Sequence, residues 1–318
     1  MVARMAKAFV FPGQGSQTVG MGKELALAFP AARAVFDEVD DALRQNLSDI
    51  MFGGPLETLT LTENAQPALM AVSLAAMRAL ETQGVRLADH AKFVAGHSLG
   101  EYSALAAAGA LSVSDAARLL RIRGKAMQTA VPVGQGAMAA LLGVGKDAAE
   151  KLAAEAAQGE VCQLANDNEP TQAVISGAKG AIDRAAGLAK AYGVRRFIPL
   201  NVSAPFHCAL MQPAADAMAD ALASVEIKRP VVPVIANVMA SPVSDPAEIT
   251  RCLVEQVTGA VRWRECVVAM CERGVTDFYE IGVGKVLAGL VKRVAPSANA
   301  ISVGAAPDID AAVALLRP

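Results

Sequence analysis

Short apolar runs alternate with longer amphipathic segments along the first part of the chain. AKAFVF at residues 6–11 and KFVAG at residues 92–96 each end in a glycine-rich turn, which is typical of buried strands. Helical periodicity occupies the segments around them, at residues 22–46, 65–83, 99–108 and from Ser114, an expected N-cap, to about residue 130. Strands that alternate with helices in this way favour a parallel sheet covered on both faces.

The pattern changes after VPVGQG at residues 131–136. The next segments read strand, helix, strand, strand, helix, strand, at residues 137–143, 147–157, 161–165, 172–177, 179–192 and 195–199. This βαββαβ order is the ferredoxin-like unit. We therefore expect a small ferredoxin-like domain over residues 133–200, inserted into a larger α/β domain that comprises residues 1–132 and 201–318.

The second part of the larger domain continues the alternation. Its expected elements are a helix after His207, a strand near 231–236, helices at 246–257 and 263–273, a strand at 275–280 and a helix after Gly284. The chain as a whole is predicted to be an α/β protein with a parallel sheet in its larger domain.

Composition supports a folded protein with a sizeable core. Of the 318 residues, 53% are hydrophobic and 19% are charged, which argues against disorder. The formal net charge of −2 gives no general case for binding nucleic acid or an anionic membrane. The richest apolar stretch, at residues 68–80, is interrupted by Arg78 and is too short to span a bilayer.

The cysteines and the N-terminus suggest a cellular compartment. The chain has five cysteines, an odd number, and no CxxC pair, so neither a disulfide framework nor a zinc site is indicated. The segment at residues 1–11 runs into an apparent strand and lacks a cleavable signal pattern. We expect a cytoplasmic protein that holds no metal.

GHSLG at residues 96–100 is the first candidate for chemistry. It fits the G-x-S-x-G pattern of a nucleophile elbow, and it lies between an expected strand and an expected helix, as that turn requires. Such a strained turn needs small neighbours, and it points the hydroxyl toward the helix start, where backbone N–H groups can stabilise an oxyanion. An ordinary strand–helix turn is the alternative, but the context favours Ser98 as a nucleophile.

A serine nucleophile needs a base, and the chain has three histidines. His97 should project away from the Ser98 hydroxyl and pack or hydrogen-bond behind the turn. His90 lies in a polar stretch where a solvated side chain is expected. His207 lies in an irregular segment before a helix, where catalytic groups concentrate, so it is the favoured base. No acidic residue stands out as the group that orients its imidazole, and a backbone carbonyl could do so instead.

One arginine falls on the apolar face of the helix expected after Ser114. On a helical wheel Arg123 lies near the centre of the apolar arc, whose members are Ala116, Leu119, Leu120, Ala126 and Met127. A buried guanidinium requires an anion, which is either an internal carboxylate or the carboxylate of a substrate. Gly124 follows and permits a close approach, which favours a binding site.

Four motifs together resemble a known family. They are PGQGSQ at 12–17, GHSLGEY at 96–102, RIRGKAMQ at 121–128 and APFH at 204–207, in this order and at this spacing. The chain resembles the malonyl-CoA:acyl carrier protein transacylases of fatty acid synthesis and the acyltransferase domains of polyketide synthases. The resemblance covers essentially the whole chain, and it implies an α/β-hydrolase-like larger domain with an inserted small domain.

The resemblance implies a role for each residue of the expected catalytic centre. Ser98 would carry the acyl group, His207 would be its base, and Arg123 would hold the free malonyl carboxylate. The backbone N–H groups of Gln14 and Leu99 would form the oxyanion hole.

Four further site residues are implied in the same way. The main-chain carbonyl of Gln256 would orient the imidazole, which would explain why no acidic third member was found. Asn166 and Gln172 match positions near the pantetheine arm. Phe206, just before the histidine, matches a position that accompanies malonyl rather than methylmalonyl selection in the polyketide relatives.

The implied reaction is a ping-pong transfer of a malonyl group from malonyl-CoA to the phosphopantetheine thiol of acyl carrier protein. Malonyl-CoA is a substrate, and no cofactor is expected. The carrier would be a transient, acidic partner. A basic rim could come from Lys190, Arg195 and Arg196, or Arg262 and Arg264, and the alternative for each is a solvated surface charge. Family members are usually monomers, so a monomer is expected.

Other functions remain open from the sequence. A serine esterase or thioesterase would share the elbow, but it would have neither Arg123 nor the inserted domain in this arrangement, and it would carry an acid between the serine and the histidine. A transacylase of polyketide synthesis or malonate degradation would perform the same reaction on another acceptor. A carrier-binding scaffold without catalysis is disfavoured because Ser98, His207 and Arg123 are all present.

Overall fold

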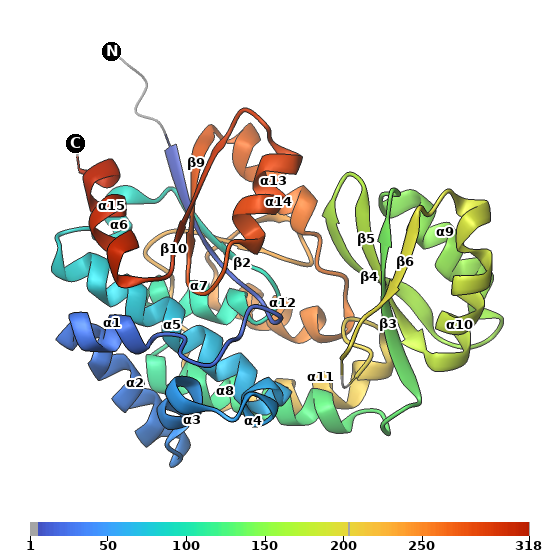
Figure 1. The fold of residues 1–318 in the computed structure, drawn as a ribbon, viewed down its shortest axis with the longest axis horizontal. Helices are drawn as coiled ribbons and strands as arrows, with labels where there is room; N and C mark the ends of the chain where they lie inside the picture. Colours follow the sequence, from blue (N-terminus) through green and yellow to red (C-terminus); the bar gives the residue numbers. More distant parts are fainter. Residues whose placement is uncertain (1–5, 203, 318) are drawn as a thin grey trace.

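The computed structural model describes residues 6–202 and 204–317 and contains two sheets with their helices, side by side (Figure 1). It confirms an α/β fold with a parallel-rich larger sheet and a second, smaller sheet. The N-terminal segment that was expected to lack a signal, and the domain ends expected at residues 1 and 318, fall partly or wholly outside the described residues. The exact limits of the two domains remain a prediction.

The larger sheet has the strand order β10-β9-β1-β2-β7-β8. Its neighbouring strands are parallel except for β8, which pairs antiparallel with β7 at one edge. The strands are β1 (Ala6–Phe11), β2 (Phe93–Gly96), β7 (Val234–Ala236), β8 (Ser241–Val243), β9 (Val275–Ile281) and β10 (Asn299–Val303). The two apolar runs of the sequence thus form the central strands, because a strand covered on both faces needs apolar side chains on both.

Helices cover both faces of the larger sheet (Figure 1). They are α1 (Lys23–Ala28), α2 (Pro30–Leu43), α3 (Leu47–Gly53), α4 (Leu56–Thr60), α5 (Thr62–Thr82), α6 (Leu87–His90), α7 (Gly100–Ala107), α8 (Val113–Thr129), α11 (Gln212–Ala223), α12 (Pro246–Thr258), α13 (Trp263–Glu272), α14 (Val286–Val294) and α15 (Ala306–Leu316), with a 3₁₀ turn at Ala209–Met211 before α11. None of the helices in the described part of the chain is long and apolar enough to cross a membrane.

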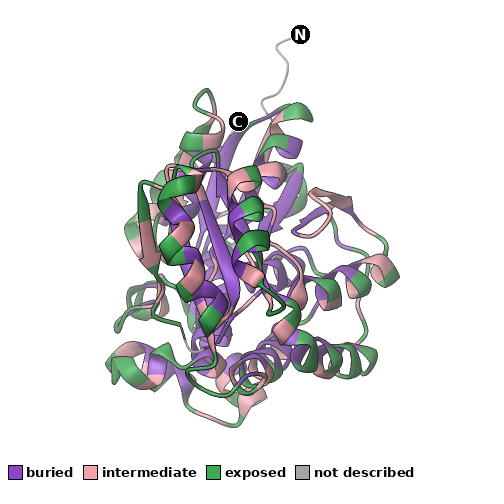
Figure 2. Ribbon diagram, turned by 90° about the vertical axis from the view of Figure 1, so that its right-hand side faces the viewer, coloured by how far each residue is buried: buried purple, intermediate pink, exposed green. Residues whose placement is uncertain are grey.

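The central strand β1 separates two hydrophobic cores. Phe9 and Phe11 face the core that contains α5 and α8, whereas Ala8 and Val10 face the core that contains α13 and α14. This alternation follows from the two-residue period of a strand. Figure 2 shows the buried residues concentrated in the strands and on the inward faces of the helices. The elbow after β2 is therefore held between two packed layers.

The smaller sheet is antiparallel with the order β4-β5-β3-β6. Along the chain its elements follow the expected βαββαβ order, as β3 (Gly136–Leu142), α9 (Lys146–Ala157), β4 (Cys162–Glu169), β5 (Gln172–Ala178), α10 (Lys179–Leu188) and β6 (Arg196–Pro199). Its helices pack on one face over a core of their own. The opposite face contributes Met138 and Asn166 to the cavity described below.

Several elements differ from the expectation. The helix expected at 22–46 is divided into α1 and α2, because Pro30 lacks a backbone N–H and begins a new helix. The helix α8 starts two residues earlier than expected, since the hydroxyl of Ser112, and not that of Ser114, accepts the Asp115 backbone N–H at 3.0 Å. The helix expected at 179–192 ends as α10 at Leu188 and continues as a 3₁₀ turn.

The C-terminal elements β10 and α15 and the short edge strand β8 were not expected. β10 lies at an edge of the sheet and is only half-buried, so its NAISV sequence carries a weak apolar pattern. β8 is a three-residue strand that contains Pro242, a residue confined to edges and strand ends. Both strands depend on pairing with a neighbour more than on their own pattern.

Candidate active site

Ser98 lies in the tight turn between β2 and α7. Its φ of +53° is left-handed, which is strained for a residue other than glycine. A Cβ at Gly96 would lie 1.9 Å from the Gly100 carbonyl carbon, and a Cβ at Gly100 would lie 2.3 Å from the Phe11 carbonyl oxygen. Both flanking glycines are therefore needed so that the turn can fold against the end of β1.

His207 meets the serine from a segment distant in sequence. The Ser98 Oγ lies 2.8 Å from His207 Nε2, and His207 Nδ1 lies 2.9 Å from the Gln256 carbonyl oxygen and 3.2 Å from that of Gly259. Because a carbonyl can only accept, the proton resides on Nδ1, and Nε2 is left to accept the serine hydroxyl. The residue also has a left-handed φ of +59°.

The imidazole of His207 is neutral in this environment. Burial, together with the nearby positive charge of Arg123, lowers its pKa to about 3, and the hydrogen bonds to the two carbonyls only partly oppose this. A neutral imidazole with a free Nε2 is the form that can remove a proton from the serine.

Arg123 is 1% exposed and reaches the serine from α8. Its Nη2 donates to Ser98 Oγ at 3.0 Å and to Gln256 Oε1 at 2.8 Å, while its Nη1 donates to Gln66 Oε1 at 2.9 Å. Within the described residues no carboxylate lies at ion-pair distance from it, and burial lowers its pKa. Of the two partners that the sequence allowed, a direct internal carboxylate is thus not found, and the guanidinium is held by neutral groups.

Gly124 permits a different close approach from the one expected. A Cβ at this position would lie 2.6 Å from the Glu63 Cα and from the Thr62 carbonyl oxygen, at the start of α5. The glycine therefore lets two helices touch, and it brings Gln66 of α5 to Arg123. It is not among the described residues that line the cavity introduced below.

These residues border a cavity of about 700 Å³ between the two sheets. Most of the predicted site residues line it, namely Gln14, Ser98, Leu99, Arg123, Asn166, Phe206 and His207. The backbone N–H groups of Gln14 and Leu99 have no hydrogen-bond acceptor among the described residues. N–H groups without an acceptor, in residues that line the same cavity as the serine, could stabilise an oxyanion.

Two predicted site residues lie elsewhere. Gln256 is fully buried in α12 behind the serine and is not among the described residues that line the cavity. Gln172 pairs with Leu142 at the end of the β3–β5 ladder remote from Met138, so it does not reach the cavity. The sequence predicted the order of the strands along the chain. Which end of β5 lies near the cavity depends on how the small sheet packs against the larger one.

The two other histidines are engaged away from the serine hydroxyl. His97 Nε2 contacts Asn168 Oδ1 at 2.9 Å and its ring lies against Trp263, with ring centroids 5.8 Å apart. Burial lowers the pKa of His97. The Nδ1 of His90 contacts the Arg86 carbonyl oxygen at 2.8 Å. Neither ring contacts Ser98 Oγ, so among the three histidines only His207 lies at hydrogen-bond distance from it.

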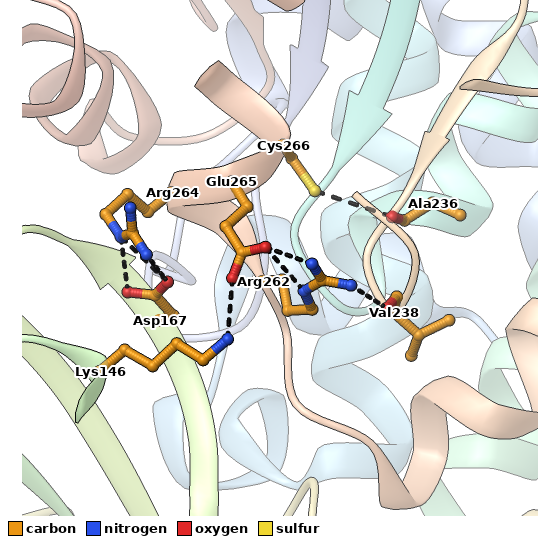
Figure 3. A network of polar contacts seen from close by, with 8 residues as sticks. All are labelled: Lys146, Asp167, Ala236, Val238, Arg262, Arg264, Glu265 and Cys266. Atoms are coloured by element: carbon orange, nitrogen blue, oxygen red, sulfur yellow. Dashed lines mark hydrogen bonds and ion pairs between the residues drawn. The ribbon is translucent and has the colours of Figure 1, made fainter. Parts of the chain in front are cut away.

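Charged side chains connect the two sheets (Figure 3). Arg264 of α13 pairs with the buried Asp167 of β4 at 2.9 Å, and Lys146 pairs with Glu265 at 3.1 Å. Arg262 pairs with the same Glu265. Arg262 and Arg264, which had been considered for a basic rim, are thus occupied within the protein.

The connection also fixes one wall of the cavity. Val261, just before α13, exchanges backbone hydrogen bonds with β4, from Asp167 N to Val261 O at 3.0 Å and from Val261 N to Ala165 O at 2.8 Å. Asn166 lies between these contacts and faces the cavity. Lys190, in the 3₁₀ turn after α10, and Arg195 and Arg196, at the start of β6, are exposed.

Asn237, at the end of β7, was missed by sequence reasoning. Its Oδ1 accepts the Ser98 backbone N–H at 2.8 Å, and its Nδ2 donates to the Gly96 carbonyl at 2.7 Å. It thus bridges the two ends of the elbow. The available signal was a polar side chain directly after the apolar run VIA at residues 234–236, but the sequence alone does not place that strand beside β2.

Comparison with known proteins supports a single family. The family described as "Acyl transferase domain" matches residues 8–313. A malonyl CoA-acyl carrier protein transacylase of Bacillus subtilis is 47% identical over 98% of this chain and 97% of its own length, and one of Escherichia coli is 45% identical over 92% and 94%.

Solved structures agree in the fold. The acyl-carrier-protein S-malonyltransferase of Bartonella henselae has a TM-score of 0.96 and 55% identity, over 98% of this chain and 99% of that one. A malonyl transacylase solved in complex with the acyl carrier protein of a type II polyketide synthase has a TM-score of 0.94 and 42% identity, over 98% and 99%.

Proposed function

Because the chain belongs to the acyl transferase family, we propose that it transfers the malonyl group of malonyl-CoA to the phosphopantetheine thiol of acyl carrier protein, for fatty acid synthesis. The position of Arg123 is the observation that supports malonyl as the acyl group. Its guanidinium is buried in the cavity wall, 3.0 Å from the Ser98 hydroxyl, with neutral partners only among the described residues. A buried cation at this distance from a nucleophile suits an acyl group that ends in a carboxylate.

The first half of the reaction forms an acyl-enzyme. The malonyl carboxylate pairs with Arg123, and Ser98 Oγ attacks the thioester carbonyl while His207 Nε2 takes the hydroxyl proton. The N–H groups of Gln14 and Leu99 stabilise the oxyanion. The C–S bond then breaks, and His207 returns the proton to the departing CoA sulfur, which leaves malonyl-Ser98.

The second half reverses these steps on another thiol. The phosphopantetheine thiol of the carrier gives its proton to His207 and attacks the malonyl-serine carbonyl. The C–O bond breaks, and the proton returns to Ser98 Oγ. One thioester replaces another, so the overall reaction is nearly isoergic and reversible. Neither half requires a cofactor or a metal.

The remaining residues have supporting roles. The Gln256 carbonyl holds the Nδ1–H of His207 and fixes its tautomer, which an aspartate does in many serine enzymes. Asn166 and Phe206 border the space that the pantetheine arm and the acyl group would occupy. We further propose that the protein acts as a cytoplasmic monomer with a transient carrier partner, for which the exposed Lys190, Arg195 and Arg196 offer positive charge.

A transfer assay tests the function. Purified protein, malonyl-CoA and the holo form of a fatty acid acyl carrier protein are mixed, and the mass of the carrier is followed. Malonyl-carrier should accumulate to equilibrium, and Ser98→Ala should abolish it. Steady release of CoA without a mass increase on the carrier would indicate a hydrolase instead. A polyketide carrier that is malonylated far faster than the fatty acid carrier would assign the enzyme to the other pathway.

A further inference from the structure

A buried carboxylate lies directly behind the nucleophile. Glu101 follows Ser98 by almost one turn, at the start of α7, and is 1% exposed. Burial raises its pKa to about 7, while two hydrogen bonds and the charge of Arg123 oppose this rise. The reaction described above does not use this group. A buried carboxylate is costly without partners, so its partners indicate what it does.

The first partner of Glu101 is Asn237. The Oε2 of Glu101 accepts the Asn237 backbone N–H at 3.0 Å. The side chain of Asn237 in turn holds the Ser98 N–H and the Gly96 carbonyl, as described above. Since Ser98 has a strained, left-handed φ, a fixed Asn237 helps to maintain the turn that presents the nucleophile.

The second partner is Gln256, which is fully buried in α12. Its Nε2 donates to the same Oε2 of Glu101 at 2.9 Å and to the Ser98 carbonyl at 3.1 Å. Its amide oxygen therefore points the other way and accepts Nη2 of Arg123 at 2.8 Å. Its backbone carbonyl accepts the Nδ1–H of His207. One residue thus contacts the nucleophile, the base and the guanidinium.

We propose that Glu101 is a positioning residue for acyl transfer, which acts through Gln256 on Arg123. The inference rests on the proposed function, because it assigns Arg123 to the substrate carboxylate. A glutamine amide can turn over and exchange its donor and acceptor ends. The Glu101 oxygen favours the orientation in which Oε1 receives Arg123, whereas the reversed amide would set its NH₂ against the guanidinium, donor against donor.

Two substitutions test whether the hydrogen-bond acceptor of Glu101 matters, separately from the length and the charge of its side chain. Glu101→Met has a similar length but offers no strong acceptor. Glu101→Gln keeps one oxygen, and one oxygen is enough because both hydrogen bonds end on Oε2. We expect Glu101→Met to lower kcat/KM with malonyl-CoA by roughly 10–100-fold, the usual effect of losing a group that orients a site residue, and with acetyl-CoA by much less. Glu101→Gln should restore most of the activity and the selectivity.

Glu280 provides a matched control. It is also fully buried, and its carboxylate accepts two backbone N–H groups, from Leu287 at 3.0 Å and from Ala288 at 2.8 Å, but it does not touch the site residues. Glu280→Met should lower the melting temperature without a change in the ratio of malonyl to acetyl kcat/KM. If Glu101→Met does not fold, Glu101→Leu, which also lacks an acceptor, replaces it and should show the same loss of selectivity.

These experiments distinguish a failure of the proposed function from a failure of the role proposed for Glu101. If the wild-type protein does not malonylate the carrier, the proposed function fails. If the wild-type protein does so, but Glu101→Met or Glu101→Leu lowers malonyl and acetyl transfer in equal proportion, Glu101 does not position Arg123 and the inference is wrong. Equal loss in Glu101→Gln and Glu101→Met would also overturn it, because the retained oxygen would then be of no use.

Discussion

Replacing Arg123 by methionine should remove the preference for malonyl over acetyl groups. The side chain is buried, and its Nη1 and Nη2 atoms are already hydrogen-bonded to neutral oxygens. In the free enzyme the cation therefore lacks an anion at contact distance within the described residues. The malonyl carboxylate supplies that anion, and an acetyl group does not.

The magnitude follows from the number of charge-assisted contacts. A hydrogen bond that involves charged groups contributes about 1.5–3 kcal/mol, so a carboxylate held by two N–H groups gains about 3–6 kcal/mol. Each 1.4 kcal/mol corresponds to about a factor of ten in kcat/KM. Arg123→Met should therefore lower kcat/KM for malonyl-CoA by roughly 100-fold or more, and it should change kcat/KM for acetyl-CoA by less than about tenfold.

The assay compares both substrates at saturating carrier. Arg118→Met is the matched control, because Arg118 lies on the same helix with a side chain that is 53% exposed and pairs with Asp115. It should leave both kcat/KM values unchanged. If Arg123→Met lowers malonyl and acetyl transfer by the same factor, Arg123 supports the fold or the serine and does not select the acyl group.

Three other perturbations test separate parts of the account. Because burial and Arg123 lower the pKa of His207 to about 3, its imidazole stays neutral as the pH falls from 7 to 5. In a pH–rate profile kcat/KM should therefore change by less than about threefold over this range. If His207 had an ordinary pKa, kcat/KM would fall by roughly 20-fold. Gly124→Ala should lower the free energy of unfolding by about 1–3 kcal/mol in a urea titration, because its Cβ would overlap the start of α5, whereas Gly289→Ala, in an open helical position, should raise it slightly. Arg264→Met should lower the free energy of unfolding by about 1–3 kcal/mol, since it leaves the buried Asp167 unpaired. Arg33→Met, which breaks the exposed Arg33–Asp37 pair, should lower it by less than about 0.5 kcal/mol in the same titration.

Local patterns predicted the parts of the fold that depend on local causes. The apolar runs before the turns became β1 and β2, and the wheel placed Arg123 on the buried face of its helix, where it is 1% exposed. The glycines around Ser98 were interpreted correctly as a steric requirement, because that requirement arises within a few residues. The position of the helix N-cap was wrong by two residues, since Ser112 and Ser114 are both able to cap.

The sequence could not supply the contacts between distant segments. The partners of Arg123 come from α5 and α12, and the residue that braces the elbow, Asn237, comes from β7. Glu101 belongs to the same motif as Ser98, yet its role becomes visible only when Gln256 is placed beside it. Gln172 shows the converse, because its strand was predicted correctly but its place in the strand lies away from the cavity. These features depend on how the helices and sheets pack against one another. The local pattern of apolar and polar residues does not determine that packing.

The central claim is that Ser98 carries the malonyl group between the two thiols. It is tested most directly by incubating the protein with malonyl-CoA in the absence of carrier, followed by intact mass measurement and peptide mapping. The account predicts one malonyl adduct on the peptide that contains Ser98, absent in Ser98→Ala, weak with acetyl-CoA and lost when holo carrier is added. An adduct on another residue, or turnover of malonyl-CoA in the presence of carrier by Ser98→Ala, would contradict it.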